Sequence, residues 1–496
     1  MNVALRRTAY AIFVVFLLLA ASVSYVQAVN GPEYRDDPRN PRLVAWRTGR
    51  ERGPIVTADQ VVVAVSQQSR EDAKLFERVY PHGELYAHTV GYTSVLFGSR
   101  GLEREHASTL TSDRDSTISG VLNGILGGDT RPRGLRITID HGLQMVAEEA
   151  LDGQKGAVVA IDPATGAVLA LVSNPTFDPN SLLGPGAGET GQALESDPNE
   201  PLRNRVTDES YSPGSVFKVV TTGSGLDTGL VSPSSLFPDP IELELPGSES
   251  TIKNFNGEVC DDGTQVTLEY AFIHSCNTTF AQLGMDLGGN QLATTSNRFG
   301  FNQSVPFDLD VLTSFFPDDG SLEDNLPATA QSAIGQRDVQ STPFLMALTA
   351  AAVANDGTMM APYLVYDVFT SDGVVESSTV PQAWRRSMSP ATATVLADLM
   401  EQVVVSGTGS RAAVPGIRIA GKTGTAQVTG TAPHAWFIGY GPVEPELGEH
   451  SIAIAVVVES GGNSGESASG GSVAAPNRPE STRPLLRRDG ELTPRS

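Results

Sequence analysis

Residues 156–173 read GAVVAIDPATGAVLALVS, two runs of small and β-branched residues on either side of a short polar stretch. That stretch, DPATG, contains the residue types that favour tight reversals, so the sequence predicts a β-hairpin with strands at 156–161 and 167–173. Three later runs also have the composition of strands, at 418–427, 435–440 and 451–459. We expect these early and late strands to form one five-stranded antiparallel sheet flanked by helices from the middle of the chain, an α+β fold.

Flanking patterns extend this sheet into a domain. A strand is predicted at 135–139, and a helix is predicted from Gly142 to Leu151. Ser389-Pro390 is a helix-start signal, and Gly407 marks the end of that helix. We therefore expect one large domain to cover 131–476.

The N-terminal end has the pattern of a membrane anchor. Residues 9–29 carry no charge and follow Arg6-Arg7. The run is long enough for one transmembrane helix, and the arginine pair predicts that residues 1–8 stay in the cytoplasm. Residues 26–28 (VQA) resemble a signal-peptide cleavage site, so removal of this segment is the alternative.

Beyond this segment, composition predicts three further regions. Residues 30–52 have the charge and proline content of a linker, and 53–130 resemble a small α+β domain that contains no catalytic constellation. Residues 477–496 are expected to be a disordered tail. The formal net charge of −23 argues against nucleic acid as a partner.

The chain has two cysteines, Cys260 and Cys276. In an exported protein they can form one disulfide, and two free buried thiols are the alternative. The seven histidines form no pair with metal-ligand spacing, so the sequence predicts neither a metal nor another cofactor.

Lysine is rare in this sequence, with five lysines among 34 basic residues. Two of the five lie in short motifs, Ser215-Val216-Phe217-Lys218 and Lys422-Thr423-Gly424. A serine hydroxyl becomes a good nucleophile only when a base takes its proton; a desolvated lysine can be that base, whereas arginine stays protonated. Pro213-Gly214 precedes an apolar run, so we expect a helix start that places Ser215 and Lys218 on one face.

Ser-x-x-Lys alone is a weak signal, because residues 250–253 also match it. A more specific signal comes from Ser275-Cys276-Asn277, which is the only Ser-x-Asn in the chain and lies between Ser215 and the only Lys-Thr-Gly. The order Ser-x-x-Lys, Ser-x-Asn, Lys-Thr-Gly is shared by penicillin-binding proteins and active-serine β-lactamases.

Together with further segments, these motifs make the chain resemble the class B penicillin-binding proteins, the membrane-anchored D,D-transpeptidases of cell-wall synthesis, and most of all an actinobacterial subgroup. The likeness reaches to about residue 476 and includes 52–55, 98–103, 156–166, 177–180, 211–215, 335–336, 342–343, 355–357, 421–427 and 435–437. There are two departures. Val56 to Asp59 replace the Asp-Arg-Asn-Gly of many relatives, and Arg337 stands where a second glycine often follows Gly-Gln.

The resemblance implies the penicillin-binding transpeptidase and serine β-lactamase fold. It also implies a peptidoglycan D,D-transpeptidase that cross-links stem peptides through an acyl-enzyme on Ser215, releases D-alanine and is inhibited by β-lactams. Lys218 would be the general base, Ser275 would relay a proton to the leaving amine, and Asn277 would orient Lys218. Lys422 would supply positive potential.

The remaining implied roles concern binding. Thr423 and Thr425 would offer hydroxyls to the substrate carboxylate, Gly424 would leave the strand edge open for the peptide, and the N–H groups of Ser215 and Thr425 would form an oxyanion hole. The resemblance further implies a single-pass protein of the cell membrane whose catalytic domain lies outside the cytoplasm. A polytopic glycan polymerase and the cell-division or elongation machinery are its expected partners.

Other readings share part of this pattern. A D,D-carboxypeptidase uses water as acceptor, and the sequence scarcely separates it from a transpeptidase. In a class A β-lactamase a deacylating glutamate is expected between the second and third motifs; Glu323, Glu376 and Glu401 lie there, and none has an asparagine four residues later. A penicillin sensor and a non-catalytic cell-wall scaffold are further alternatives. A Ser-His-Asp hydrolase is disfavoured because no Gly-x-Ser-x-Gly is present.

Two residues near the motifs leave their roles open. His274 could tune the site or only pack locally. Trp436 could line the pocket or be a buried aromatic of a strand.

Overall fold

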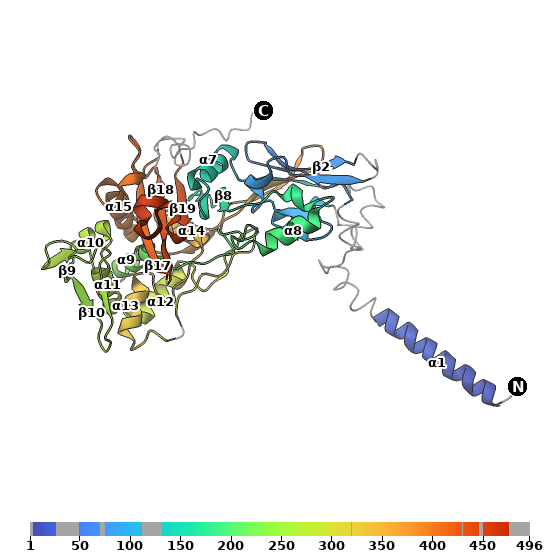
Figure 1. Ribbon diagram of the computed structural model, residues 1–496, viewed down its shortest axis with the longest axis horizontal. Helices are drawn as coiled ribbons and strands as arrows, with labels where there is room; N and C mark the ends of the chain where they lie inside the picture. Colours follow the sequence, from blue (N-terminus) through green and yellow to red (C-terminus); the bar gives the residue numbers. More distant parts are fainter. Residues whose placement is uncertain are drawn as a thin grey trace.

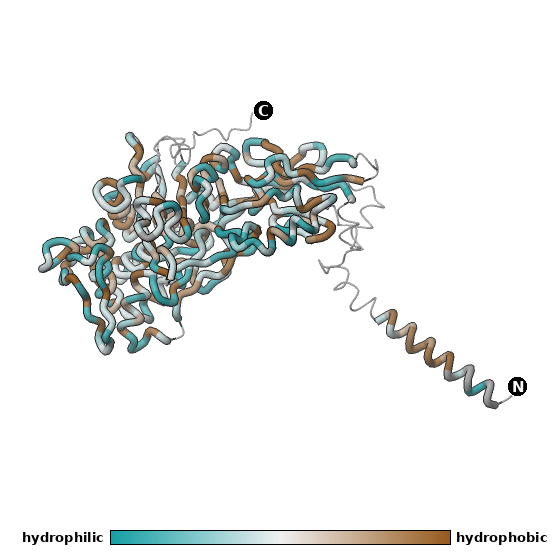
Figure 2. Tube along the Cα trace, in the orientation of Figure 1, coloured by the Kyte–Doolittle hydropathy of each residue, from teal (hydrophilic) through white to brown (hydrophobic). Residues whose placement is uncertain are grey.

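The computed structural model describes residues 3–25, 49–69, 75–111, 131–318, 320–428, 430–445 and 450–475. The chain begins with helix α1 (Val3–Tyr25), whose run of apolar residues is visible in Figure 2. Across the described ranges, the structure contains no helix that meets the length and apolar character of a membrane crossing. The predicted anchor at 9–29 is therefore not confirmed. Most of the predicted linker and the tail at 477–496 lie outside the described residues.

The predicted five-stranded sheet is confirmed. Its strands are β7 (Gly156–Ile161), β8 (Val168–Asn174), β17 (Ala420–Val428), β18 (Thr431–Gly441) and β19 (Ile452–Val458). They are arranged in the order β17-β18-β19-β7-β8, and every neighbouring pair is antiparallel. In the β7–β8 turn the Asp162 carboxylate accepts hydrogen bonds from the N–H groups of Ala164 and Thr165, which is the turn chemistry expected of aspartate. β17 is left as an edge strand.

Helices cover this sheet (Figure 1). α14 (Pro343–Ala354) packs on β7, β18 and β19, and it is buried on all sides because its sequence is apolar all round. α7 (His141–Leu151) and α15 (Pro390–Val405) are the two helices predicted from sequence, and they pack on β8 and β17. The α15 N-terminus is capped by the Ser389 hydroxyl, which accepts from the Thr392 N–H, and Pro390 occupies the first turn.

A second group of helices lies beyond β17: α9 (Lys218–Asp227), α10 (Leu268–His274), α11 (Asn277–Leu287), α12 (Gly289–Arg298) and α13 (Leu326–Ala333). Both Ser-x-x-Lys and Ser-x-Asn end at helix starts in this group, because Lys218 opens α9 and Asn277 opens α11. The motif residues are thus delivered to one region by the ends of helices and by the edge of a sheet.

A six-stranded sheet forms the N-terminal part of the molecule. Its strands are β1 (Ile55–Val56), β2 (Val62–Gln68), β3 (Phe76–Val79), β6 (Gly134–Ile137), β14 (Val365–Phe369) and β15 (Val375–Ser378), in the order β15-β14-β6-β1-β2-β3. The strand predicted at 135–139 is therefore present as β6, but it pairs with β1 and β14 in this sheet. Two strands from the second half of the chain complete a sheet begun by the first.

A buried charge cluster holds this part together. The Glu103 side chain is 0% exposed and contacts Arg52 and Arg78, each with an N–O distance of 2.6 Å. Burial raises the pKa of Glu103, but the two guanidinium groups more than reverse this effect, so the pKa lies below its usual value. Removing one partner from such a cluster typically costs about 3–5 kcal/mol, because a charge is left buried without compensation. The segment that enters from the N-terminal side is therefore firmly fixed at Arg52.

Candidate active site

Ser215 lies in a 3₁₀ turn, η5 (Gly214–Phe217), directly before α9. The sequence predicts a helix that starts at Ser215; the α-helix instead begins at Lys218, because Gly214 takes a left-handed φ of 54° and the chain first makes a tighter turn. A side chain at Gly214 would also lie 2.9 Å from the Thr425 carbonyl oxygen. Glycine therefore lets the turn press against β17, with Ser215 half-buried at the contact.

Lys218 is fully buried and points to the Ser-x-Asn motif. Its ammonium donates to the Ser275 carbonyl at 2.7 Å, to the Asn277 Oδ1 at 2.8 Å and to the Ser275 Oγ at 3.4 Å. Within the described part of the chain, Ser215 is not among its hydrogen-bond partners. In enzymes without bound substrate such contacts are often long, and they shorten when the substrate is in place.

Ser275 links the two lysines. It has a left-handed φ of 63°, a strained conformation for a residue other than glycine. Lys422, the second fully buried lysine, donates to the same Ser275 Oγ at 2.7 Å and to the Thr423 carbonyl at 3.1 Å. One hydroxyl therefore lies between two ammonium groups.

Burial changes the protonation of both lysines. It lowers the pKa of Lys218 well below the usual value, and the charge of Lys422 lowers it further. Burial also lowers the pKa of Lys422 to about 7. Both shifts favour the neutral amine, which is the form of lysine that can accept a proton.

The loop before Ser-x-Asn positions Asn277, and sequence reasoning missed it. The Asn277 side-chain N–H donates to the Lys253 carbonyl at 3.0 Å, which leaves its Oδ1 to face Lys218. The Asn254 Oδ1 accepts from the N–H groups of Asn277 and Thr278 at 2.7 and 3.2 Å. Asn254 thus caps α11, whose own N-cap residue Cys276 makes no capping hydrogen bond. Residues 250–253 looked in the sequence like a chance copy of the first motif, yet their backbone helps to build the site.

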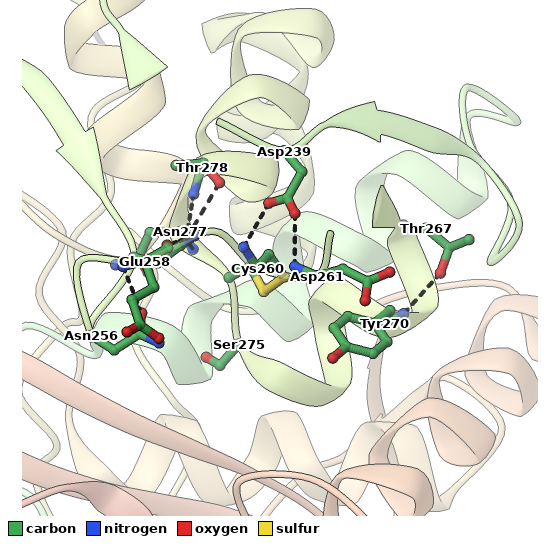
Figure 3. Close-up of a disulfide and its surroundings, with 12 residues drawn as sticks. Asp239, Asn256, Glu258, Cys260, Asp261, Thr267, Tyr270, Ser275, Asn277 and Thr278 are labelled. Carbon is green, nitrogen blue, oxygen red and sulfur yellow. Dashed lines mark hydrogen bonds between the residues drawn. A yellow bond between two sulfur atoms is a disulfide. The ribbon is translucent and has the colours of Figure 1, made fainter. Parts of the chain in front are cut away.

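The predicted disulfide between Cys260 and Cys276 is present, with a Cα–Cα distance of 5.8 Å (Figure 3). It ties the same loop to the Ser-x-Asn motif. The Asp239 carboxylate holds the loop from the other side, where it accepts from the N–H groups of Cys260, Asp261 and Gly263 at 2.7–3.0 Å. This wall of the site is therefore fixed both covalently and by hydrogen bonds.

Lys422, Thr423, Gly424 and Thr425 lie on the edge strand β17. A side chain at Gly424 would lie 3.0 Å from the Pro213 carbonyl oxygen, so glycine is needed here for the contact with the Ser215 turn. From the sequence, Gly424 was instead expected to leave the strand edge open for a bound peptide. The Thr423 hydroxyl lies 2.6 Å from the hydroxyl of Thr408, a residue that the sequence did not single out.

These residues surround a cleft of about 1130 Å³ that Ser215, Ser275, Asn277, Thr423 and Thr425 line. His274 is also in the lining, and its ring packs against that of Tyr270 with centroids 4.2 Å apart and the ring planes tilted by 35°. Trp436 is fully buried, and its indole N–H donates to the Ser212 carbonyl at 3.2 Å. Of the two roles considered for Trp436, pocket lining or buried strand aromatic, the structure therefore shows the second.

Comparison with known proteins gives a consistent result. Residues 156–479 match the penicillin binding protein transpeptidase domain, and residues 52–136 match the penicillin binding protein A dimerisation domain. The chain is 38% identical to the peptidoglycan D,D-transpeptidase PbpA of Mycolicibacterium smegmatis, over 96% of this chain and 97% of the relative. It is 36% identical to the protein of that name from Mycobacterium tuberculosis, with the same coverage.

Solved structures agree with these relatives. Penicillin-binding protein A of M. tuberculosis as a ceftriaxone acyl-enzyme superimposes with a TM-score of 0.81 at 35% identity, covering 89% of this chain and 99% of that one. Its penicillin G acyl-enzyme gives a TM-score of 0.78 at the same identity, covering 88% and 99%.

The capping role of Asn254 can be tested by mutation. We expect Asn254→Ala to lower the second-order rate of acylation by a fluorescent penicillin about tenfold or more, because Asn277 loses the acceptor that fixes its backbone. Asn256→Ala is the matched control, since this exposed residue of the same loop forms its hydrogen bonds, as far as the described residues extend, with Glu258 of that loop. Equal acylation rates for the two variants would contradict the role given to Asn254.

Proposed function

The chain belongs to the penicillin-binding protein transpeptidase family and is a peptidoglycan D,D-transpeptidase; on this basis we propose that Ser215 is its nucleophile and Lys218 its general base. The observation that carries this assignment is the convergence of two buried lysines on Ser275, beside the turn that presents Ser215. An uncharged amine at Lys218 can take the Ser215 proton as the hydroxyl attacks the carbonyl between the last two D-alanines of a stem peptide.

Ser275 is suited to return that proton. Its hydroxyl lies within hydrogen-bond distance of both lysines. In the proposed first step the bond from Ser215 Oγ to the carbonyl carbon forms and the peptide bond breaks. The proton then passes from Lys218 through Ser275 to the amine of the departing D-alanine. In the second step the amine of another stem peptide attacks the acyl-enzyme, gives up its proton by the same route and forms the cross-link.

The edge strand is proposed to hold the donor peptide. Lys422 keeps a positive field at the end of the cleft, and the hydroxyls of Thr423 and Thr425 are offered to the terminal carboxylate. The N–H groups of Ser215 and Thr425 are proposed as the oxyanion hole, each worth a few kcal/mol of barrier, roughly 3 kcal/mol. The close approach of Gly214 to the Thr425 carbonyl supports this pairing, since it brings the turn and the strand into contact.

The division of the chain is proposed as follows. Residues 131–476 carry the transpeptidase activity, and 53–130 form a non-catalytic pedestal. The two matched domain families, at 156–479 and 52–136, support this division.

The nucleophile and base are tested by acylation. Ser215→Ala is expected to abolish labelling by fluorescent penicillin, and Lys218→Arg to slow it by a factor of about 10² to 10⁴, because arginine cannot accept the proton. Labelling of Ser215→Ala at the wild-type rate would rule out the assignment. With a D-Ala-D-Ala stem peptide, D-alanine release without cross-linking would indicate a carboxypeptidase, and rapid loss of the label would indicate a β-lactamase.

The two lysines should affect the pH dependence of the acylation rate in opposite directions. Lys218 acts as the neutral amine, so acylation should become faster as the pH rises through its lowered pKa. Lys422 acts as the cation and has a pKa of about 7, so acylation should become slower again at higher pH. Lys422→Arg keeps the charge, and we expect it to retain activity while losing the alkaline decline. Acylation rates measured from about pH 5 to about pH 10 would show this, and an unchanged decline in the variant would contradict it.

We also propose that residues 9–29 anchor the protein in the cell membrane with the catalytic domain outside the cytoplasm, and that its partner there is a polytopic glycan polymerase of the division or elongation machinery. The support is the uncharged run behind Arg6-Arg7 and the exposure of apolar side chains along α1, such as Phe13 at 63%. Deleting residues 1–29 is expected to move the protein from the membrane to the soluble fraction without loss of penicillin labelling, and to end its copurification with the polymerase. Membrane retention of the truncated protein would exclude this anchor.

A further inference from the structure

The walls of the cleft are cationic although the protein is acidic. The chain has 57 acidic and 34 basic residues, yet no aspartate or glutamate is among the described residues that line the cleft. Apart from His274, the titratable side chains that line it are Lys253 and Arg337, and the two buried lysines lie beside it. A cleft with this charge attracts anionic groups. In the proposed function one carboxylate is placed on β17, which leaves the cations of the walls unassigned.

Arg337 lies close to the nucleophile turn. The Gly335 carbonyl accepts from the Gly214 N–H at 2.8 Å. A side chain at Gly335 would lie 2.3 Å from the Gly214 carbonyl oxygen, so the two segments are in direct backbone contact. This contact holds Gly335 against the residue that precedes Ser215, and Arg337 follows two residues later in the lining of the same cleft.

The backbone conformation at position 337 does not favour an arginine. Its φ of 63° lies in the left-handed region, where glycine is favoured and a residue with a side chain is strained. The guanidinium is 39% exposed, and its one ion pair in the described ranges joins it to the exposed Asp338 at 3.1 Å. Exposed pairs of this kind are weak, so the guanidinium is available to another carboxylate.

Lys253 is less available for such a contact. Its ammonium pairs with Glu242 at 3.1 Å, across the short hairpin of β10 (Glu242–Glu244) and β11 (Thr251–Lys253). Its backbone carbonyl already accepts a hydrogen bond from the Asn277 side chain. A planar guanidinium also fits a carboxylate better than an ammonium does, because it can donate two parallel hydrogen bonds.

We propose that Arg337 binds a second carboxylate of the donor stem peptide, one on the side chain of the residue that precedes D-Ala-D-Ala. The enzyme would then prefer peptides in which this group is a free acid over those in which it is an amide. This inference rests on the proposed role of Ser215. The terminal carboxylate lies on the leaving side of the scissile bond, where Thr423 and Thr425 are proposed to bind it, and the acyl half of the donor lies on the other side of that bond. The first side chain on that half that can carry a charge belongs to the residue before D-Ala-D-Ala, since alanine has only a methyl group.

The test compares two D-Ala-D-Ala peptides that differ only in a side-chain carboxylate or its primary amide at that residue. We expect the full-length wild-type enzyme to release D-alanine from the acid with a kcat/KM about tenfold higher than from the amide. Arg337→Gly should bring this ratio close to one. The variant removes the charge and relieves the backbone, so its thermal unfolding should be no lower than that of the wild type. Asp338→Asn frees the guanidinium and should increase the ratio.

Three results would overturn the proposal. The first is equal kcat/KM values for the two peptides in the wild type. The second is an acid-to-amide ratio of kcat/KM in Arg337→Gly that equals the wild-type ratio. The third is a ratio that falls to one in Lys253→Gln but not in Arg337→Gly. A failure of the proposed function gives a different result, because the wild type would then release D-alanine from neither peptide.

Discussion

Two ammonium groups share one hydroxyl at the centre of this protein, and both lysines are fully buried. Among the described residues, the hydrogen-bond partners of the two Nζ atoms are all neutral, namely carbonyls, the Ser275 hydroxyl and the Asn277 amide. Two like charges cannot both persist in such a place without strong repulsion and desolvation, so the site favours a state in which one lysine has given up its proton. The surrounding structure has to hold this unfavourable arrangement in position.

The parts that do so come from separate regions of the chain. The Ser215 turn presses on β17 through Gly214 and Gly424, and α11 is capped by Asn254 from a loop that the disulfide ties down. The described residues offer a rigid frame on both sides of the cleft, a hydrogen-bonded strand and a cross-linked loop. Such a frame allows a charge arrangement to be prepared before the substrate arrives, which is how preorganised sites lower barriers.

The sequence predicted the five-stranded sheet because its strands have strong local patterns, and it found the three motifs because each is short and two are unique. The loop at 251–263 could not be predicted, since its contribution is made by backbone carbonyls and by one asparagine in a polar stretch that resembles any other. Thr408 was also missed, because its hydroxyl meets that of Thr423, 15 residues later, only through the way the intervening chain folds back. The joining of β14 and β15 to the N-terminal sheet was also hidden, because a short strand does not reveal its partner when some 230 residues separate the two, as they do for Val365 and Ile137.

The six-stranded sheet has a consequence for how the chain acquires its shape. Synthesis delivers β1, β2, β3 and β6 early, but β6 remains an open edge until β14 has been made, and β14 in turn waits for β15. An open edge offers unpaired N–H and C=O groups to any strand nearby. The N-terminal sheet therefore stays incomplete until most of the catalytic domain has been synthesised. The two units then complete their folding together and not one after the other along the chain. A pedestal cut out at residue 130 or 136 would lack part of its own sheet.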